Sequence, residues 1–167
     1  MSEIEQAVKE IEAYVAADGW DGPVRVFSLV DAQKAMAANS ALATELPAGA
    51  AGLLSIEQEG LPSSDSIEEL LGRLAWPDAV DGAAVSLERV TLPPEAEAEI
   101  PDDAEEARRF VAADPRREEI RMVVGVLRNG ESWCAIRLRS HDSQAEAISG
   151  ADLVPEMVEA LLATFAE

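Results

Sequence analysis

Cysteine and histidine are the scarcest reactive residues in this chain, with one of each among 167 residues. A single cysteine excludes a disulfide within the chain, which fits a reducing compartment such as the cytoplasm. One cysteine and one histidine also exclude a zinc site built from these ligands. Cys134 lies in the middle of an apolar run and is predicted to be a buried, inert thiol, whereas His141 is predicted to be a solvated loop residue.

Long apolar runs are absent as well. No run approaches the roughly 20 residues of a transmembrane helix. The first ten residues, MSEIEQAVKE, are acidic and amphipathic, whereas a signal peptide has a basic start and an apolar run. We therefore expect a cytoplasmic protein that does not enter a membrane.

The chain also lacks the common catalytic and nucleotide-binding motifs. It contains no Gly-x-Ser-x-Gly, no P-loop, no Gly-x-Gly-x-x-Gly and no EF-hand loop. Adjacent acids occur at 68–69, 102–103, 105–106 and 118–119, but adjacent residues on a helix do not face each other, so most of them should be solvated or capping acids. We predict no catalytic residue, no cofactor and no metal site, although carboxylates alone leave a Mg²⁺ or Ca²⁺ site open as an alternative.

Positive charge is scarce, since 13 basic residues face 33 acidic ones and give a net charge of −20. Duplex DNA and anionic membrane would be repelled by such a surface, so neither is an expected partner. The basic residues are nevertheless concentrated: residues 108–139 carry eight arginines and four acids. These arginines either complement acidic helices and loops within the protein, or they form a site for an anionic ligand or an acidic partner.

The clearest structural signal is the segment 118–140, EEIRMVVGVLRNGESWCAIRLRS. Two apolar-rich runs meet at Asn129-Gly130, a pair that favours a two-residue type I′ turn and therefore a β-hairpin. That turn would place Val126 opposite Trp133 and Val124 opposite Ala135. The first strand is apolar on both faces, which predicts a central place in the sheet.

The whole chain is predicted to form a single α+β domain, 1–167, with a mainly antiparallel sheet of about five strands. Strands are expected at 24–30, 53–58, 83–92, 118–128 and 131–140. Helices are expected at 2–18, 32–46, 66–75, 102–113 and from Asp152 to near the C-terminus. The acidic, proline-containing segment 93–103 is expected to be a flexible loop. Strands that alternate with helices also fit a parallel sheet, but the helices at 32–46 and 66–75 look poor as crossover units.

Two helices carry strong apolar stripes, at 4–15 and 154–165. The simplest partner for each stripe is the sheet of the same domain. Together the stripes could exceed what one sheet face covers, and this suggests a homodimer.

Five residues are candidates for binding a ligand or partner: Trp20, Asp21, Trp76, Arg137 and Arg139. The two tryptophans lie in turns beside Gly or Pro, where they either pack at the edge of the core or form a shared aromatic rim. The predicted register sets Arg137 and Arg139 on one face, with their stems on Met122 and Ile120. Their heads should meet carboxylates of the segment 95–103 or of the N-terminal helix, and replacing both with Gln should then cost little stability.

An ordered series of short motifs runs through nearly the whole chain: Gly19-Trp20-Asp21-Gly22-Pro23-x-Arg25, Ile56-x-Gln58-Glu59-x-Leu61-Pro62, Trp76-Pro77, Leu92-Pro93-Pro94, Asp114-Pro115-Arg116, Gly125-Val126-Leu127-Arg128-Asn129-Gly130 and Asp152-Leu153-Val154-Pro155. The series resembles an uncharacterised family of small acidic proteins of actinobacteria. This resemblance implies a source and supplies no catalytic residues. The order of elements is also loosely similar to type III secretion chaperones, which is an analogy of fold alone.

The sequence therefore favours a non-enzymatic, cytoplasmic protein-binding or adaptor protein that is chaperone-like in its layout. The alternative is a small-ligand-binding protein or an enzyme with a pocket near the Trp20 and Trp76 loops. A deep pocket lined by either tryptophan, with converging carboxylates, would favour the alternative.

Overall fold

The computed structural model describes residues 2–38, 52–61, 66–142, 147–151 and 153–165. The elements follow the chain in this order: α1 (Glu3–Ala16), β1 (Arg25–Asp31), α2 (Ala32–Ala38), β2 (Leu53–Glu57), α4 (Ile67–Gly72), β3 (Gly82–Thr91), α5 (Pro94–Glu97), α6 (Ala104–Ala113), β4 (Glu118–Leu127), β5 (Ser132–Leu138), the 3₁₀ turn η1 (Arg139–His141), β6 (Ile148–Gly150) and α7 (Pro155–Ala163). None of the described helices is long and apolar enough to cross a membrane.

Six strands form one open sheet in the order β2-β1-β3-β4-β5-β6, and every neighbouring pair is antiparallel. The predicted α+β class is confirmed, and β4 occupies the central place that its two apolar faces indicate. The edge strand β6 was not expected, because the polar segment before Gly150 carries no strand pattern. The helix predicted at 32–46 is observed over 32–38, and the rest of that prediction lies outside the described residues.

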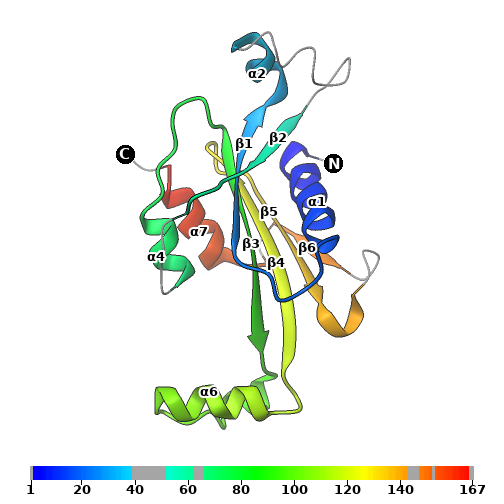
Figure 1. Cartoon of the computed structure of the whole chain (residues 1–167), viewed down its shortest axis with the longest axis vertical. Coiled ribbons are helices and arrows are strands. Elements are labelled where there is room, and N and C mark those ends of the chain that lie inside the picture. The colour runs from blue at the N-terminus through cyan, green and yellow to red at the C-terminus, as the bar shows by residue number, and fades with distance from the viewer. Residues whose placement is uncertain (1, 39–51, 62–65, 143–146, 152, 166–167) are drawn as a thin grey trace.

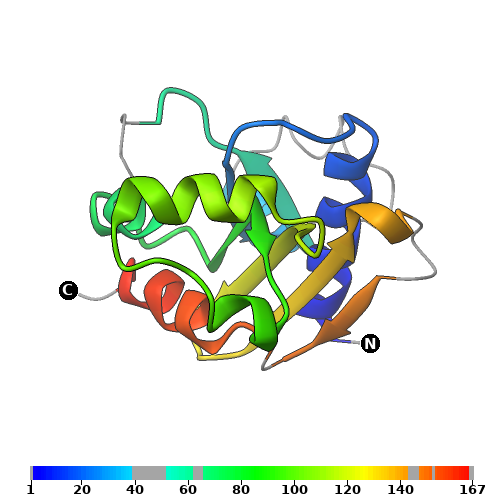
Figure 2. The same cartoon turned by 90° about the horizontal axis from the view of Figure 1, so that it is seen from below.

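The two faces of the sheet are covered by different helices (Figures 1 and 2). α1 covers one face, and α4 and α7 cover the other. The α1 face is packed by Ile4, Val8, Ile11, Val15, Phe27, Leu29 and Val123. The α7 face is packed by Val26, Val85, Val124, Val126, Leu70, Met157 and Leu161. Each apolar helical stripe is thus covered by a sheet face of its own. The apolar surface left over, which was the reason for expecting a homodimer, is therefore accounted for within one chain. The homodimer stays a prediction.

The hairpin of β4 and β5 is present, but its predicted turn and register are wrong. Gly130 alone has a positive φ in this loop, of 98°, whereas a type I′ turn also needs one at Asn129. The amide of Leu127 donates to the Glu131 carbonyl at 2.8 Å. This hydrogen bond closes a loop of three residues, where the prediction had two. Val124 consequently lies opposite Cys134 instead of Ala135.

This shift of one residue moves every β5 side chain to the other face of the sheet relative to the expectation. Arg137 lies opposite Arg121, on the α1 face, and not against Met122. Arg139 falls beyond the end of β5, in η1. The expected shared face of Arg137 and Arg139, with stems on Met122 and Ile120, is therefore wrong.

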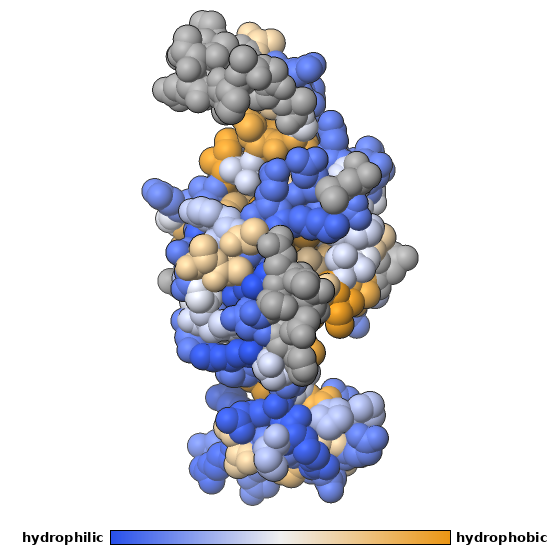
Figure 3. Space-filling view, turned by 90° about the vertical axis from the view of Figure 1, so that its right-hand side faces the viewer, coloured by the Kyte–Doolittle hydropathy of each residue, from blue (hydrophilic) through white to orange (hydrophobic). Residues whose placement is uncertain are grey.

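β3 and β4 continue beyond the strands beside them and carry an arm made of α5 and α6 (Figure 1). β1 pairs only with residues 82–86 of β3, so the last five residues of β3 pair with β4 alone. The arm is mostly hydrophilic on the side shown in Figure 3. Part of the expected loop 93–103 is the short helix α5, whose Ala96 is fully buried.

Candidate functional site

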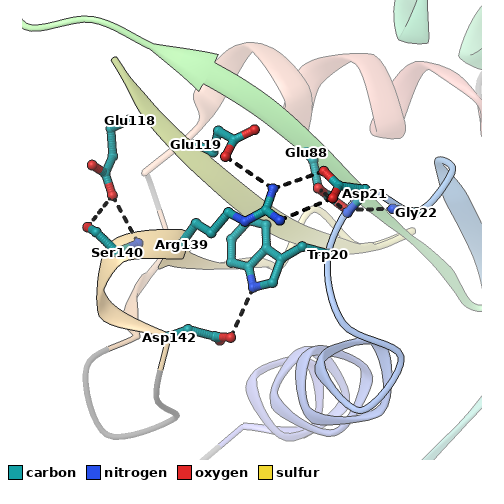
Figure 4. A network of polar contacts seen from close by, with 9 residues as sticks. All are labelled: Trp20, Asp21, Gly22, Glu88, Glu118, Glu119, Arg139, Ser140 and Asp142. Atoms are coloured by element: carbon teal, nitrogen blue, oxygen red, sulfur yellow. Dashed lines mark hydrogen bonds and ion pairs between the residues drawn. The ribbon is translucent and has the colours of Figure 1, made fainter. Parts of the chain in front are cut away.

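Four of the five candidate residues meet where α1 ends and turns into β1. Gly19 and Asp21 both have positive φ, of 80° and 67°, and this lets the chain reverse sharply before β1. The Glu88 carboxylate accepts hydrogen bonds from the amides of Asp21 and Gly22, at 2.9 and 3.0 Å (Figure 4). A side chain of β3 thereby holds the turn in place.

Trp20 is half-buried beside two arginines. Its ring centre lies 4.6 Å from the guanidinium carbon of Arg121 and 5.6 Å from that of Arg139, within the range of a cation–π interaction. Its indole Nε1 donates to the Asp142 carboxylate at 3.0 Å. The ring therefore connects α1 to the segment that follows β5.

Arg139 forms the outer part of the cluster. It donates through both terminal nitrogens to Asp21, at 2.9 and 3.1 Å, and also to Glu119 at 3.1 Å. Its hydrogen bond to Asp21, and then its charge, lowers the pKa of that carboxyl below the ordinary value. The side chains of Arg139 and Asp21 are both exposed to solvent.

Beneath Trp20 lies a buried ionic triad of Glu12, Arg121 and Arg137. One Glu12 oxygen accepts from Arg121 at 3.2 Å and the other accepts from Arg137. Arg121 also donates to the Gly19 carbonyl at 3.1 Å, and Arg137 to Asp142 at 3.0 Å. The Nε groups of both arginines are buried without a hydrogen-bond partner in the described structure. The triad fixes α1 on the sheet.

Trp76 takes no part in this cluster. Its indole donates to the Thr164 hydroxyl at 2.8 Å, and its ring stacks on Phe165 with 6.1 Å between ring centres. These contacts belong to the α7 face, whereas Trp20 rests on Arg121 on the α1 face. The two tryptophans therefore form no shared rim.

A hollow of about 430 Å³ opens beside Trp20. It is lined by Val15, Asp18, Gly19, Trp20, Asp21, Gly22, Pro23, Arg25, Glu57, Ser86, Leu87 and Glu88. All four lining carboxylates are engaged: Asp18 and Glu57 bind Arg25, Asp21 binds Arg139, and Glu88 holds the turn amides. The hydrogen bonds that Arg25 donates to Glu57 and to Asp18 raise the pKa of Arg25 above its ordinary value.

The residues that the sequence analysis missed are Glu12, Arg121, Glu88 and Asp142. A signal existed for two of them. Glu12 follows Val8 by four residues and so shares the apolar stripe of α1, and Arg121 interrupts an apolar strand. Glu88 and Asp142 stand in polar surroundings that single out neither residue.

Arg137 and Arg139 should respond differently to replacement. Arg139→Gln should leave the thermal unfolding midpoint nearly unchanged, because its partners are exposed. Arg137→Gln should lower the midpoint strongly, because Glu12 would keep a buried charge with less compensation. Thermal unfolding of the two single variants tests this, and equal losses would contradict the separation of the two arginines.

Asp142 should contribute stability that depends on pH. Hydrogen bonds from Trp20 and then Arg137 lower its pKa in the folded protein. The contribution is therefore complete above the unfolded pKa of about 3.9 and is lost as pH falls through the lower, folded pKa. Asp142→Asn should reduce the unfolding free energy at about pH 5 more than at about pH 3. Urea unfolding of both proteins measures this, and a difference that stays constant with pH would refute it.

Comparison with known proteins identifies a family to which the chain is similar. A family model described as PPA1309-like protein matches residues 4–166, nearly the whole chain. No curated protein and no solved structure gives a significant match.

Proposed function

The chain belongs to the PPA1309-like protein family, and we propose that it is a non-enzymatic, cytoplasmic protein-binding or adaptor protein. The observation that carries this proposal is that the charged groups lining the hollow beside Trp20 are already paired within the protein. Its four carboxylates and Arg25 already bind one another, a neighbouring arginine or the backbone. These groups serve to join α1, β1, β2 and β3.

A general acid or base must reach a substrate proton with a free carboxyl or imidazole group. Each lining carboxylate would have to leave a partner first. Cys134 is fully buried, and its sulfur lies 3.9 Å from the Ala151 carbonyl, so the thiol is not presented to a substrate. This arrangement favours binding over catalysis.

The arginine-rich hairpin supports the same view. Arg121, Arg137 and Arg139 are all bound to carboxylates of the protein itself. Internal complementarity therefore accounts for these three without an anionic ligand. The remaining net charge of −20 favours a basic partner. The proposal includes an actinobacterial source and a chaperone-like role, which the resemblance and the layout of the elements suggest.

The test is affinity purification of the tagged protein from its native cell, with reciprocal purification of what binds. A stoichiometric protein partner that persists in moderate salt is expected. Recovery of the protein alone, with a bound metabolite seen by native mass spectrometry, would overturn the proposal. Light scattering of the same sample decides whether a homodimer forms.

The second candidate is a small-ligand-binding protein, and the hollow itself favours it. A volume of about 430 Å³ lies in the range of ligand pockets, and Trp20 offers a ring for stacking. Trp76 lies outside this hollow. A metabolite that remains bound to the wild type and is lost from Trp20→Ala would support this candidate.

A further inference from the structure

Among the residues that the structure describes, the outer edge of β2 has backbone groups that no other strand pairs with. β2 is the first strand of the sheet, so β1 is the one described strand that pairs with it. Gln58 donates its amide to the Val26 carbonyl at 2.8 Å, and Ala32 donates to the Gly52 carbonyl at 2.9 Å. In an antiparallel pair such bonds recur at every second residue. Residues 52, 54, 56 and 58 therefore face β1, and the N–H and C=O groups of 53, 55 and 57 point outward.

This edge carries little of the protection that edge strands usually have. Its five residues, Leu53–Glu57, contain no proline, and their register with β1 runs without a bulge. The one charged side chain, Glu57, is held by Arg25 at 2.6 Å. Ile56 is 50% exposed on the α7 face of the sheet. The edge is thus a suitable template for another strand.

We propose that β2 binds an extended segment of a partner protein by strand addition, with lysine or arginine at the position beside Glu57 and apolar residues beside Leu54 and Ile56. The proposal rests on the proposed function and names its surface. Glu57 lies on the α1 face, opposite Phe27 and next to the hollow that also contains Asp18 and Glu88. Arg25 balances only part of this negative charge, so a cation fits there.

A second copy of the chain fits this edge poorly. It would bring another −20 of charge. Symmetric pairing about Ser55 would set Glu57 opposite Leu53 of the copy and supply no cation. Charge complementarity therefore selects a basic segment of a different protein.

The register fixes which residues of the bound segment make the hydrogen bonds. Residues directly opposite 53, 55 and 57 form the hydrogen-bonded pairs and point to the α1 face. The position opposite Glu57, which the proposal assigns to lysine or arginine, is one of these. The apolar residues point to the α7 face, and their own N–H groups face away from β2.

The probe is a short peptide of alternating lysine and valine, made in two N-methylated forms with the same charge and side chains. Backbone N-methylation of the lysines should abolish binding, because it removes the hydrogen bonds to β2. N-methylation of the valines should preserve binding. Fluorescence anisotropy at physiological ionic strength gives the affinities, and hydrogen exchange should slow at the amides of 53, 55 and 57. Equal binding of both forms would overturn the proposal and indicate attraction by charge alone.

Ser55→Pro tests the same edge from the protein side. Its N–H points outward, so proline removes no bond to β1 and the fold should persist. Peptide affinity should fall at least about tenfold, whereas Ser55→Ala, which keeps the N–H, should bind as the wild type does. If Ser55→Pro fails to fold, the two peptide forms still decide on the wild-type protein. A wild-type dimer that Ser55→Pro dissolves would assign the edge to a second copy and overturn the proposed partner.

The native partner separates this inference from the proposed function. If the Ser55→Pro variant still binds the native partner as tightly as the wild type does, strand addition at β2 is wrong, whereas the proposed adaptor function is unaffected. Absence of any protein partner, with a bound metabolite in its place, would overturn the adaptor function itself.

Discussion

Glu12→Gln is expected to lower the free energy of unfolding by about 3–5 kcal/mol. Glu12 is 4% exposed, and its carboxylate is shared by two buried arginines. The substitution keeps the size of the side chain but removes the negative charge between them. The Gln amide offers one acceptor oxygen in place of two, and its NH₂ group would face an arginine, so the two buried guanidinium groups lose both a shared acceptor and their counter-charge. Urea unfolding monitored by tryptophan fluorescence measures the loss.

Glu10→Gln is the matched control, because it makes the same chemical change two residues away on the exposed side of α1. Its side chain contacts Gln6 within the helix, so the change in unfolding free energy should stay within about 0.5 kcal/mol. Similar effects of the two variants would show that the buried triad has no special role.

Apolar replacement of all three triad members asks a different question. Glu12→Leu combined with Arg121→Met and Arg137→Met removes the buried charges together, and buried ion networks so replaced often lose no stability. We expect much of the loss seen in Glu12→Gln to be recovered. Such recovery would indicate that the triad specifies where α1 docks more than it stabilises the fold.

The hydrophobic patterns of the sequence predicted most of the strands and helices because burial and periodicity are local properties. The alternation in β4 and the stripes of α1 and α7 each follow from residues that lie close in sequence. The exact pairing of β4 with β5 did not follow, because Asn129-Gly130 allows both a two-residue and a three-residue loop. The structure uses the longer loop, in which Gly130 alone is left-handed.

That single step in register explains most of what was missed at the site. With Arg137 on the wrong face, Arg121 was not recognised as its neighbour. A carboxylate of the N-terminal helix was among the expected partners, and Glu12 is that carboxylate for Arg137. Glu12 lies 109 residues from Arg121 and 125 from Arg137 along the chain. A buried charge reveals itself only through such distant partners, so the sequence could nominate Arg137 without showing why it is there.

Gly82→Ala is expected to destabilise the protein by about 3 kcal/mol or more. Gly82 begins β3 and pairs with Leu127 at the centre of the sheet. A Cβ atom here would lie 2.3 Å from the Val126 carbonyl oxygen and 2.8 Å from a methyl group of Leu127. The carbonyl belongs to the backbone of β4 and cannot turn aside, so the two central strands would have to separate. Chemical denaturation and hydrogen exchange of the β3 and β4 amides measure the effect.

Alanine substitutions at two other glycines should have smaller effects and serve as comparisons for Gly82→Ala. A Cβ at Gly125 would meet side-chain atoms, Val8 at 2.7 Å and Ile4 at 3.0 Å, and both of these can shift with α1. Gly125→Ala should therefore cost less than Gly82→Ala and should loosen α1 first, which exchange of the α1 amides would reveal. A Cβ at Gly72 meets nothing within 4 Å, so Gly72→Ala should change stability by no more than about 0.5 kcal/mol. A loss at Gly82 no larger than at Gly72 would contradict the close approach of β3 and β4 at this position.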